Sequence, residues 1–209
     1  MSRGRFITLE GGEGAGKTTQ LTALAQWLAD AGVDVLTTRE PGGSPGANEI
    51  RDLLVTGETG RWEPMSELLM HFAARHDHLS RTIRPALNRG RWVVCDRFSD
   101  STMAYQGYGH DLGRAAVEAL GALVVGDLAP DLTIVIDVPI EIGLKRTDDR
   151  PHLENRYERM APAFHARVRD GFLDIARREA GRCVVVDGAQ AAESVAEEIR
   201  TVVQERLMS

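Results

Sequence analysis

The sequence has few cysteines, no long apolar run and no excess of basic residues. Its 2 cysteines, Cys95 and Cys183, both stand in apolar strand-like segments, which indicates buried thiols rather than a disulfide, a redox pair or a metal site. No apolar run is long enough to span a bilayer, and the N-terminus lacks the apolar core of a secretion signal. Because 31 acidic residues outnumber 25 basic ones, the formal net charge of −6 disfavours broad binding to nucleic acid or anionic membranes. We therefore expect a cytoplasmic protein without a nucleic-acid or membrane partner.

Short apolar runs alternate with helical patterns along the whole chain. An apolar content of 43% is ordinary for a soluble globular protein, and 209 residues suffice for a sizeable core. The alternation favours an α/β fold in which helices cover both faces of a five-stranded parallel sheet. We find no repeat or linker and expect one domain over 1–209. The predicted strands are 5–9, 33–37, 91–95, 132–136 and 183–186, and the longest predicted helix is 66–88, with Leu69 on its apolar face and a kink at Pro85.

The stretch Gly11 to Thr18 matches the pattern G-x-x-x-x-G-K-[ST] of a phosphate-binding loop. A predicted strand precedes it and a helical pattern follows it, which is the order that such a loop needs. Glycines let backbone N–H groups turn toward anionic oxygens, and the helix N-terminus adds partial positive charge. Lys17 is expected to reach the β- and γ-phosphates of a nucleoside triphosphate, and the Thr18 hydroxyl to ligate Mg²⁺. The predicted nucleotide-binding residues are Gly11, Gly12, Glu13, Gly14, Ala15, Gly16, Lys17, Thr18 and Thr19.

A second motif, Asp96-Arg97-Phe98, stands at the end of the third predicted strand, where open α/β sheets bind ligands. An aspartate there can hold Mg²⁺ through water, and an arginine offers a bidentate fork to a second phosphate. The N-K-x-D motif with which switch GTPases bind their base does not occur in the sequence. The polar and aromatic run 99–109 has the character of a site wall rather than of core, which leaves room for a second substrate. A kinase is therefore favoured, with a phosphate-loop regulatory ATPase as a rival.

Longer motifs extend this interpretation over essentially the whole chain. They are the runs 10–19, 38–43 (TREPGG), 96–98, 101–107 (STMAYQG), 130–133 and 137–146. In these runs the sequence resembles thymidylate kinases, the phosphate-loop enzymes that phosphorylate dTMP to dTDP and so feed dTTP synthesis. The resemblance implies a phosphate-loop NTPase fold of the nucleoside monophosphate kinase type, with ATP and dTMP as substrates, Mg²⁺ as cofactor, a lid at about 147–157 and a homodimer. Another nucleoside monophosphate kinase is the nearest alternative.

The resemblance also implies roles for single residues of the dTMP pocket. Arg97 is expected to grip the dTMP phosphate, and Thr102 to contact the polar edge of thymine. Tyr105 would pack under the deoxyribose and leave no room for a 2′-hydroxyl, and Glu13 would lie near the 3′-hydroxyl. The other residues assigned to this pocket are Arg39, Pro41, Arg75 and Gln106.

Two parts of the resemblance leave alternatives open. The family has a phenylalanine that stacks on thymine where this chain has His71, and Phe72 follows it. We assign both to the dTMP pocket, although an imidazole stacks more weakly and adds a titratable group. Family members whose phosphate loop has no arginine before Gly-Lys, as here with Ala15, have a catalytic lid arginine, for which Arg146, Arg150 and Arg156 are candidates. The predicted catalytic residues are Lys17, Asp96, Arg97, Arg146 and Arg150, and the predicted metal ligands are Thr18 and Asp96.

Overall fold

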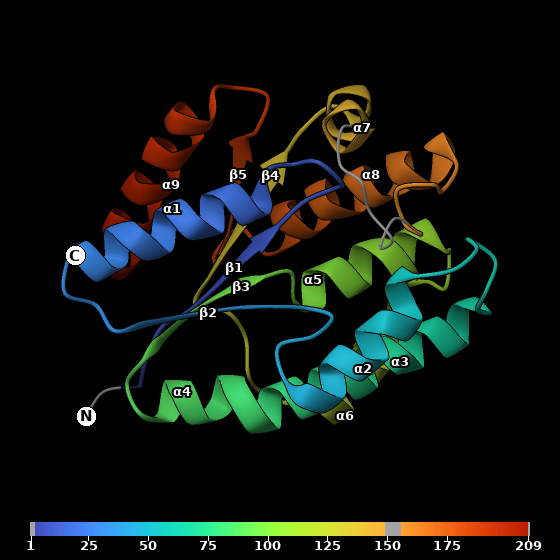
Figure 1. The fold of residues 1–209 in the computed structure, drawn as a ribbon, viewed down its shortest axis with the longest axis horizontal. Coiled ribbons are helices and arrows are strands. Elements are labelled where there is room, and N and C mark those ends of the chain that lie inside the picture. Colours follow the sequence, from blue (N-terminus) through green and yellow to red (C-terminus); the bar gives the residue numbers. More distant parts are fainter. Residues whose placement is uncertain (1–2, 149–155, 209) are drawn as a thin grey trace.

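A computed structural model describes residues 3–148 and 156–208 of the protein (Figure 1). Its centre is a sheet of five parallel strands in the order β2-β3-β1-β4-β5. The five predicted strands are confirmed, each within two residues of its predicted ends. They are β1 (Phe6–Glu10), β2 (Val35–Arg39), β3 (Trp92–Asp96), β4 (Leu132–Asp137) and β5 (Cys183–Asp187). Because β1 lies between β3 and β4, the segments that follow these three strands meet at one edge of the sheet.

Helices cover both faces of this sheet, as predicted (Figure 1). The helical segments are α1 (Lys17–Asp30), α2 (Pro45–Val55), α3 (Pro64–His78), η1 (Leu79–Ile83), α4 (Arg84–Asn88), α5 (Ser99–Thr102), η2 (Met103–Gly109), α6 (Arg114–Val124), α7 (Ile140–Asp148), α8 (Pro162–Arg178) and α9 (Ala192–Leu207). An aliphatic core that includes Leu24 and Ile199 joins α1 and α9 to one face. A second core, which includes Phe72 and Phe172, joins α3, α6 and α8 to the other. Within the described part of the chain, no helix is both long and apolar enough to cross a membrane.

The helix predicted over 66–88 is present as three consecutive segments, α3, η1 and α4. The π-helical turn η1 lies just before Pro85, whose nitrogen has no hydrogen to donate to the helical ladder. The placement of Leu69 on the core face is wrong, since its side chain is 51% exposed. Leu68 and Phe72, four residues apart, occupy the buried face of α3 instead.

The run 99–109 was expected to be site wall rather than core, and this is right for only one of its faces. It folds into the helical segments α5 and η2. Met103 and Ala104 belong to the hydrophobic core, whereas Thr102 and Tyr105 line a cavity. The difference arises because a helical turn sends neighbouring side chains in different directions.

The phosphate loop lies at the carboxyl edge of the sheet, between β1 and α1. Gly11 has φ +138°, and a Cβ on it would lie 2.4 Å from the carbonyl oxygen of Ile136. Gly14 has φ +65°, and a Cβ there would lie 1.9 Å from the carbonyl oxygen of Gly143. Only glycine fits at both positions, so the loop curls tightly against the end of β4 and against α7.

Candidate active site

Two adjoining cavities open at this edge of the sheet. The larger has a volume of about 840 Å³ and is lined by the phosphate loop from Glu13 onward, together with Arg39 and Asp96. The smaller has a volume of about 120 Å³ and is lined by segments that follow β2 and β3 and by α3. Glu13 and Arg97 line both cavities. The arrangement therefore provides two binding sites with a shared, charged boundary.

Lys17 lies folded over the phosphate loop. Its Nζ donates hydrogen bonds to the carbonyl oxygens of Gly11, at 3.1 Å, and Gly12, at 2.7 Å. Burial, followed by the neighbouring charge of Arg97, lowers the pKa of Lys17 to about 8. Gly11 and Gly12 themselves face a small cavity behind the loop, so within the loop it is residues from Glu13 to Thr19 that line the larger cavity.

Thr18 and Asp96 lie together beside the loop, where the sequence predicts a metal. The Thr18 hydroxyl donates to Oδ2 of Asp96 at 3.0 Å. The other oxygen, Oδ1, is buried without a hydrogen-bond partner among the residues that the structure describes. An oxygen-only donor set with a spare carboxylate oxygen fits Mg²⁺, which prefers few protein ligands and several phosphate or water oxygens. The described residues contain no cluster of three His, Cys, Asp or Glu side chains that would hold a metal by itself.

Arg97 lies at the boundary between the cavities, with backbone φ +69°. Its Nη1 donates to the Gly11 carbonyl at 2.9 Å and to Ser101 Oγ at 3.1 Å, and its Nη2 donates to Glu13 Oε1 at 3.0 Å. The guanidinium lies over the Tyr105 ring, 4.9 Å from its centroid, and the Tyr105 hydroxyl donates to the same Glu13 oxygen at 2.6 Å. Although burial opposes ionisation, Arg97 and Lys17 hold the pKa of Glu13 below its ordinary value. Glu13 is therefore a carboxylate that keeps cations in place inside the site.

Arg75 is a buried cation at the wall of the smaller cavity. Its Nε donates to Glu40 Oε2 at 2.7 Å, and its Nη2 donates to the Phe98 carbonyl and to Thr102 Oγ1 at 3.0 and 2.8 Å. The remaining nitrogen, Nη1, is buried without a hydrogen-bond partner in the described part of the chain. A buried donor left over on a cation is a natural contact for an anionic ligand.

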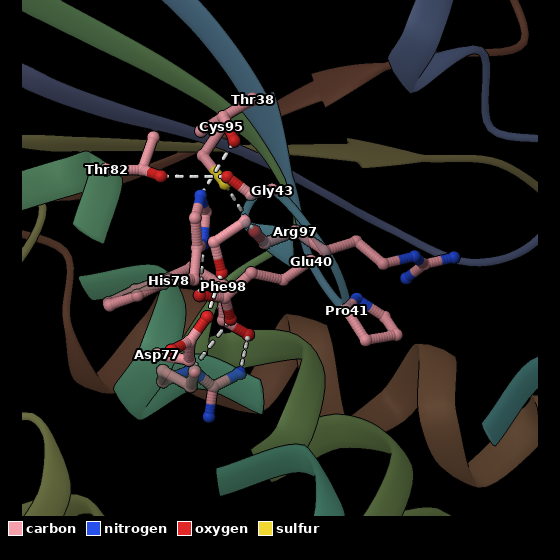
Figure 2. Close-up of polar contacts among 12 residues, drawn as sticks. Thr38, Glu40, Pro41, Gly43, Asp77, His78, Thr82, Cys95, Arg97 and Phe98 are labelled. Atoms are coloured by element: carbon pink, nitrogen blue, oxygen red, sulfur yellow. Dashed lines mark hydrogen bonds and ion pairs between the residues drawn. The ribbon is translucent and has the colours of Figure 1, made fainter. Parts of the chain in front are cut away.

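Glu40 fixes the loop that follows β2 as well as Arg75. His78 Nδ1 lies 3.0 Å from Glu40 Oε1, and His78 Nε2 lies 2.7 Å from the Thr38 hydroxyl (Figure 2). Although burial opposes ionisation, Arg75 and His78 hold the pKa of Glu40 below its ordinary value. Figure 2 shows Pro41 and the Arg97 side chain on the same side of these contacts, and both line the smaller cavity.

Comparison with known proteins identifies the chain's relatives. A family model described as thymidylate kinase matches residues 9–199. The chain belongs to the thymidylate kinase family. It is 52% identical to a thymidylate kinase of Caulobacter vibrioides, with 99% of each chain covered, and 47% identical to one of Afipia carboxidovorans, with 99% of this chain and 92% of the relative covered. It also matches a crystal structure of thymidylate kinase from Ehrlichia chaffeensis with a TM-score of 0.78 and 38% identity, over 97% of this chain and 99% of that one.

These findings confirm the family resemblance and the fold that it implied, and the geometry shows where the thymidylate kinase motifs lie. Pro41, Thr102, Tyr105 and Gln106 line the smaller cavity, as do Arg75 and Arg97. Arg39 lines the larger cavity instead. Sequence reasoning missed Tyr157, which lines the smaller cavity and stands directly after Arg156, at the end of the range expected for the lid; no motif in the sequence marks it.

His71 and Phe72 occupy different environments. His71 lines the smaller cavity, with Nε2 2.9 Å from the Tyr157 hydroxyl. Burial lowers the pKa of His71 to about 4, so its ring is neutral at pH 7. Phe72 is 3% exposed and packs in the core, where the Arg75 guanidinium lies over its ring. Phe72, which the sequence assigns to the dTMP pocket together with His71, therefore does not line the smaller cavity.

The three candidate lid arginines also differ in their surroundings. Arg156 is fully buried: it donates to the carbonyl oxygens of Leu54, Glu58 and Thr59 and forms an ion pair with Glu67. Arg156 thus fastens the chain to the end of α2 and the segment after it, and it lines neither cavity. Arg146 donates to the Gly188 carbonyl at 3.0 Å and is not among the described residues that line the two cavities. Arg150 lies outside the described residues, as do 149–155 as a whole.

Proposed function

We propose an assignment of the two cavities for the reaction of the thymidylate kinase family, in which the chain phosphorylates dTMP to dTDP with ATP. The larger cavity takes ATP and the smaller one takes dTMP. The observation that carries this assignment is the position of Arg97 and Glu13, which line both cavities. A shared boundary lets a phosphoryl group pass between two bound nucleotides, whereas a hydrolytic ATPase needs only the first site.

The chain's own residues prepare the donor side. The loop directs its backbone N–H groups at the phosphates, and Lys17 exchanges its contacts with the Gly11 and Gly12 carbonyls for the β- and γ-phosphates. Thr18 and the spare oxygen of Asp96 would hold Mg²⁺. Bound there, Mg²⁺ would neutralise charge that develops on the phosphate oxygens.

The acceptor side needs no general base. The attacking group is a phosphate oxygen of dTMP, which is already ionised at neutral pH, so catalysis depends on positioning and on charge neutralisation. Arg97 grips the dTMP phosphate, and the unpartnered Nη1 of Arg75 supports Arg75 as a second contact. These cations screen the repulsion between two anionic nucleotides at the boundary.

The rest of the smaller cavity selects the nucleoside. Tyr105 is held rigidly, by its hydroxyl on Glu13 and by edge contacts with Tyr157 and Phe164 at centroid distances of 5.5 and 6.0 Å. Because the Tyr105 ring is held in this way, it can exclude a nucleotide that carries a 2′-hydroxyl. Thr102, His71 and Gln106 form the end for the thymine base, and the buried Oε1 of Gln106 has no hydrogen-bond partner among the described residues.

Further features of the assignment concern the lid, the assembly and the location. Arg146 and Arg150 are the remaining candidates for the catalytic lid arginine, because Arg156 is committed to buried contacts.

We also propose a homodimer, supported by the exposed Leu69 and Leu123 on α3 and α6, two helices that pack together. Light scattering coupled to size-exclusion chromatography tests the dimer, which has twice the mass of the 22.9 kDa chain. We place the enzyme in the cytoplasm, the expected compartment of its nucleotide substrates.

A coupled ADP-release assay tests the proposal. The wild-type protein is given ATP, Mg²⁺ and, separately, dTMP, dUMP, ribothymidine monophosphate, dGMP or AMP. We expect ADP release with dTMP well above release with every other acceptor, and little release without an acceptor. Release that is the same with and without dTMP would indicate the regulatory ATPase, and a preference for dGMP or AMP would indicate another monophosphate kinase.

A further inference from the structure

Glu10 is a buried carboxylate that the reaction described above does not use. It is the last residue of β1, directly before the phosphate loop, and its side chain is 0% exposed. Both of its oxygens accept hydrogen bonds: Oε1 from the backbone N–H of Phe98 at 2.8 Å, and Oε2 from the Ser101 hydroxyl at 2.5 Å. Burial and the neighbouring charge of Asp100 raise the pKa of Glu10 to about 7, and these two hydrogen bonds favour the ionised form, in which both oxygens accept.

Both partners of Glu10 also hold Arg97, one through the backbone and one through the side chain. Phe98 is the next residue along the backbone, and Ser101 Oγ accepts a hydrogen bond from Arg97 Nη1 at 3.1 Å. Arg97 itself has φ +69°, a conformation that costs on the order of 1 kcal/mol for a residue with a side chain and that persists only where neighbours impose it. Its backbone N–H is fixed by the Leu9 carbonyl at 3.0 Å. On the other side of Arg97, Glu10 fixes the backbone through the N–H of Phe98.

The helix that carries Ser101 has a second anchor that does not involve Glu10. Asp100 forms a bidentate pair with Arg182, at 2.7 and 2.8 Å, and accepts a hydrogen bond from Thr133. These contacts tie α5 to β4 and to the start of β5. Loss of the Glu10 carboxylate therefore frees the turn at Arg97 more than it frees the helix.

We propose that Glu10 is a positioning residue that sets the Arg97 guanidinium at the boundary between donor and acceptor. The inference rests on the proposed function, in which Arg97 grips the dTMP phosphate. Because Glu10 also precedes the phosphate loop, one side chain fixes the distance between the donor loop and the acceptor's arginine. A shift of about 1 Å in such a group costs on the order of 10²-fold in rate.

The test compares Glu10→Ala with Glu10→Gln, Ser101→Ala and the matched control Thr8→Val. Thr8 lies two residues before Glu10 on the same strand and sheet face, is buried, and bonds to Thr133 Oγ1 at 2.8 Å. Its loss therefore removes a buried contact that reaches α5 only through Thr133 and Asp100, and it leaves both hydrogen bonds of Glu10 in place. Steady-state kinetics are measured with dTMP varied at saturating ATP and with ATP varied at saturating dTMP. Thermal unfolding of each variant is recorded alongside.

Glu10→Ala is expected to lower kcat/KM for dTMP about 10²-fold while KM for ATP changes by less than about threefold. Glu10→Gln keeps an acceptor for the Phe98 N–H and should recover most of this loss. Thr8→Val should keep near-normal kinetics even where its melting temperature falls. Equal losses in Glu10→Ala and Thr8→Val, or a Glu10→Ala defect confined to ATP, would overturn the proposal.

A Glu10→Ala variant that does not fold, and a failure of the proposed function itself, are each recognised by a separate measurement. If Glu10→Ala does not fold, Ser101→Ala decides: a kcat/KM for dTMP reduced about tenfold with normal KM for ATP supports the proposal, and unchanged kinetics contradict it. Failure of the proposed function is distinguishable, because the wild-type protein itself would then release no ADP in response to dTMP.

Discussion

Replacing Arg97 tests the assignment of the acceptor site most directly. The guanidinium has two forked nitrogens at the boundary, one near Ser101 and one on Glu13. If both turn to the dTMP phosphate, Arg97→Ala removes two charge-assisted hydrogen bonds of about 1.5–3 kcal/mol each, or roughly 3–6 kcal/mol together. Since about 1.4 kcal/mol is a factor of ten, kcat/KM for dTMP should fall about 10²–10⁴-fold.

The assay is steady-state ADP release at saturating ATP with dTMP varied. Arg114→Ala is the matched control, because Arg114 pairs with Glu118 at 2.8 Å, donates to the Tyr108 hydroxyl at 3.3 Å and lines neither cavity. A loss of less than tenfold for Arg97→Ala, or a similar loss for Arg114→Ala, would refute the role of Arg97 in acceptor binding.

A second variant separates the side chain from the backbone. Residue 97 has φ +69°, where alanine is strained and glycine is not. Arg97→Gly should therefore lose as much activity as Arg97→Ala while melting at the same or a higher temperature. Recovery of activity in Arg97→Gly would mean that backbone strain, rather than the missing guanidinium, explains the defect.

Three further predictions concern the metal, the pocket histidine and the buried ion pair. Asp96→Asn should raise the Mg²⁺ concentration needed for half-maximal rate at least tenfold, as measured by Mg²⁺ titration, because it removes the carboxylate that holds Thr18; an unchanged requirement would contradict this site. His71 has a pKa lowered from 6.5 to about 4, so the unfolded chain takes up its proton first and stability should fall as pH drops from about 6.5 to 4, by at most about 3 kcal/mol. Urea unfolding at pH 7 and pH 5 should show a smaller drop for His71→Phe than for the wild type, and equal drops would argue against a neutral buried ring. Arg156→Met should lower the free energy of unfolding by about 3–5 kcal/mol, because the buried Glu67 loses its arginine and keeps Gln106 and His110 as partners, whereas a loss of turnover at full stability would restore Arg156 as a lid residue.

Local features of the sequence were enough to predict the sheet, the phosphate loop and the strand-end motif. A glycine loop between a strand and a helix needs particular backbone angles, and residues close together in the sequence, such as Gly11 and Gly14, provide them. Strand periodicity is equally local. Because the carboxyl ends of parallel strands meet at one edge, the sequence also predicted that Asp96 and Arg97 would lie beside the loop.

Tertiary packing decided which long side chains face the cavities. Sequence alone left His71 and Phe72 both in the dTMP pocket, and only the packing of α3 places Phe72 in the core. Arg156 resembles a lid cation in sequence, yet backbone carbonyls 97 to 102 positions earlier enclose it.

The physical reason is that these choices depend on partners distant in the chain. One partner of Glu10 lies 88 positions away at Phe98, and one partner of Arg75 lies 35 positions away at Glu40. A residue's own neighbours determine its backbone, but a charged side chain stays buried only where the folded chain brings an opposite charge or a free hydrogen-bonding group to it. The sequence by itself therefore determined the phosphate cradle and the edge of the sheet where chemistry occurs, and the tertiary structure decided which cations serve the substrates and which hold the fold together.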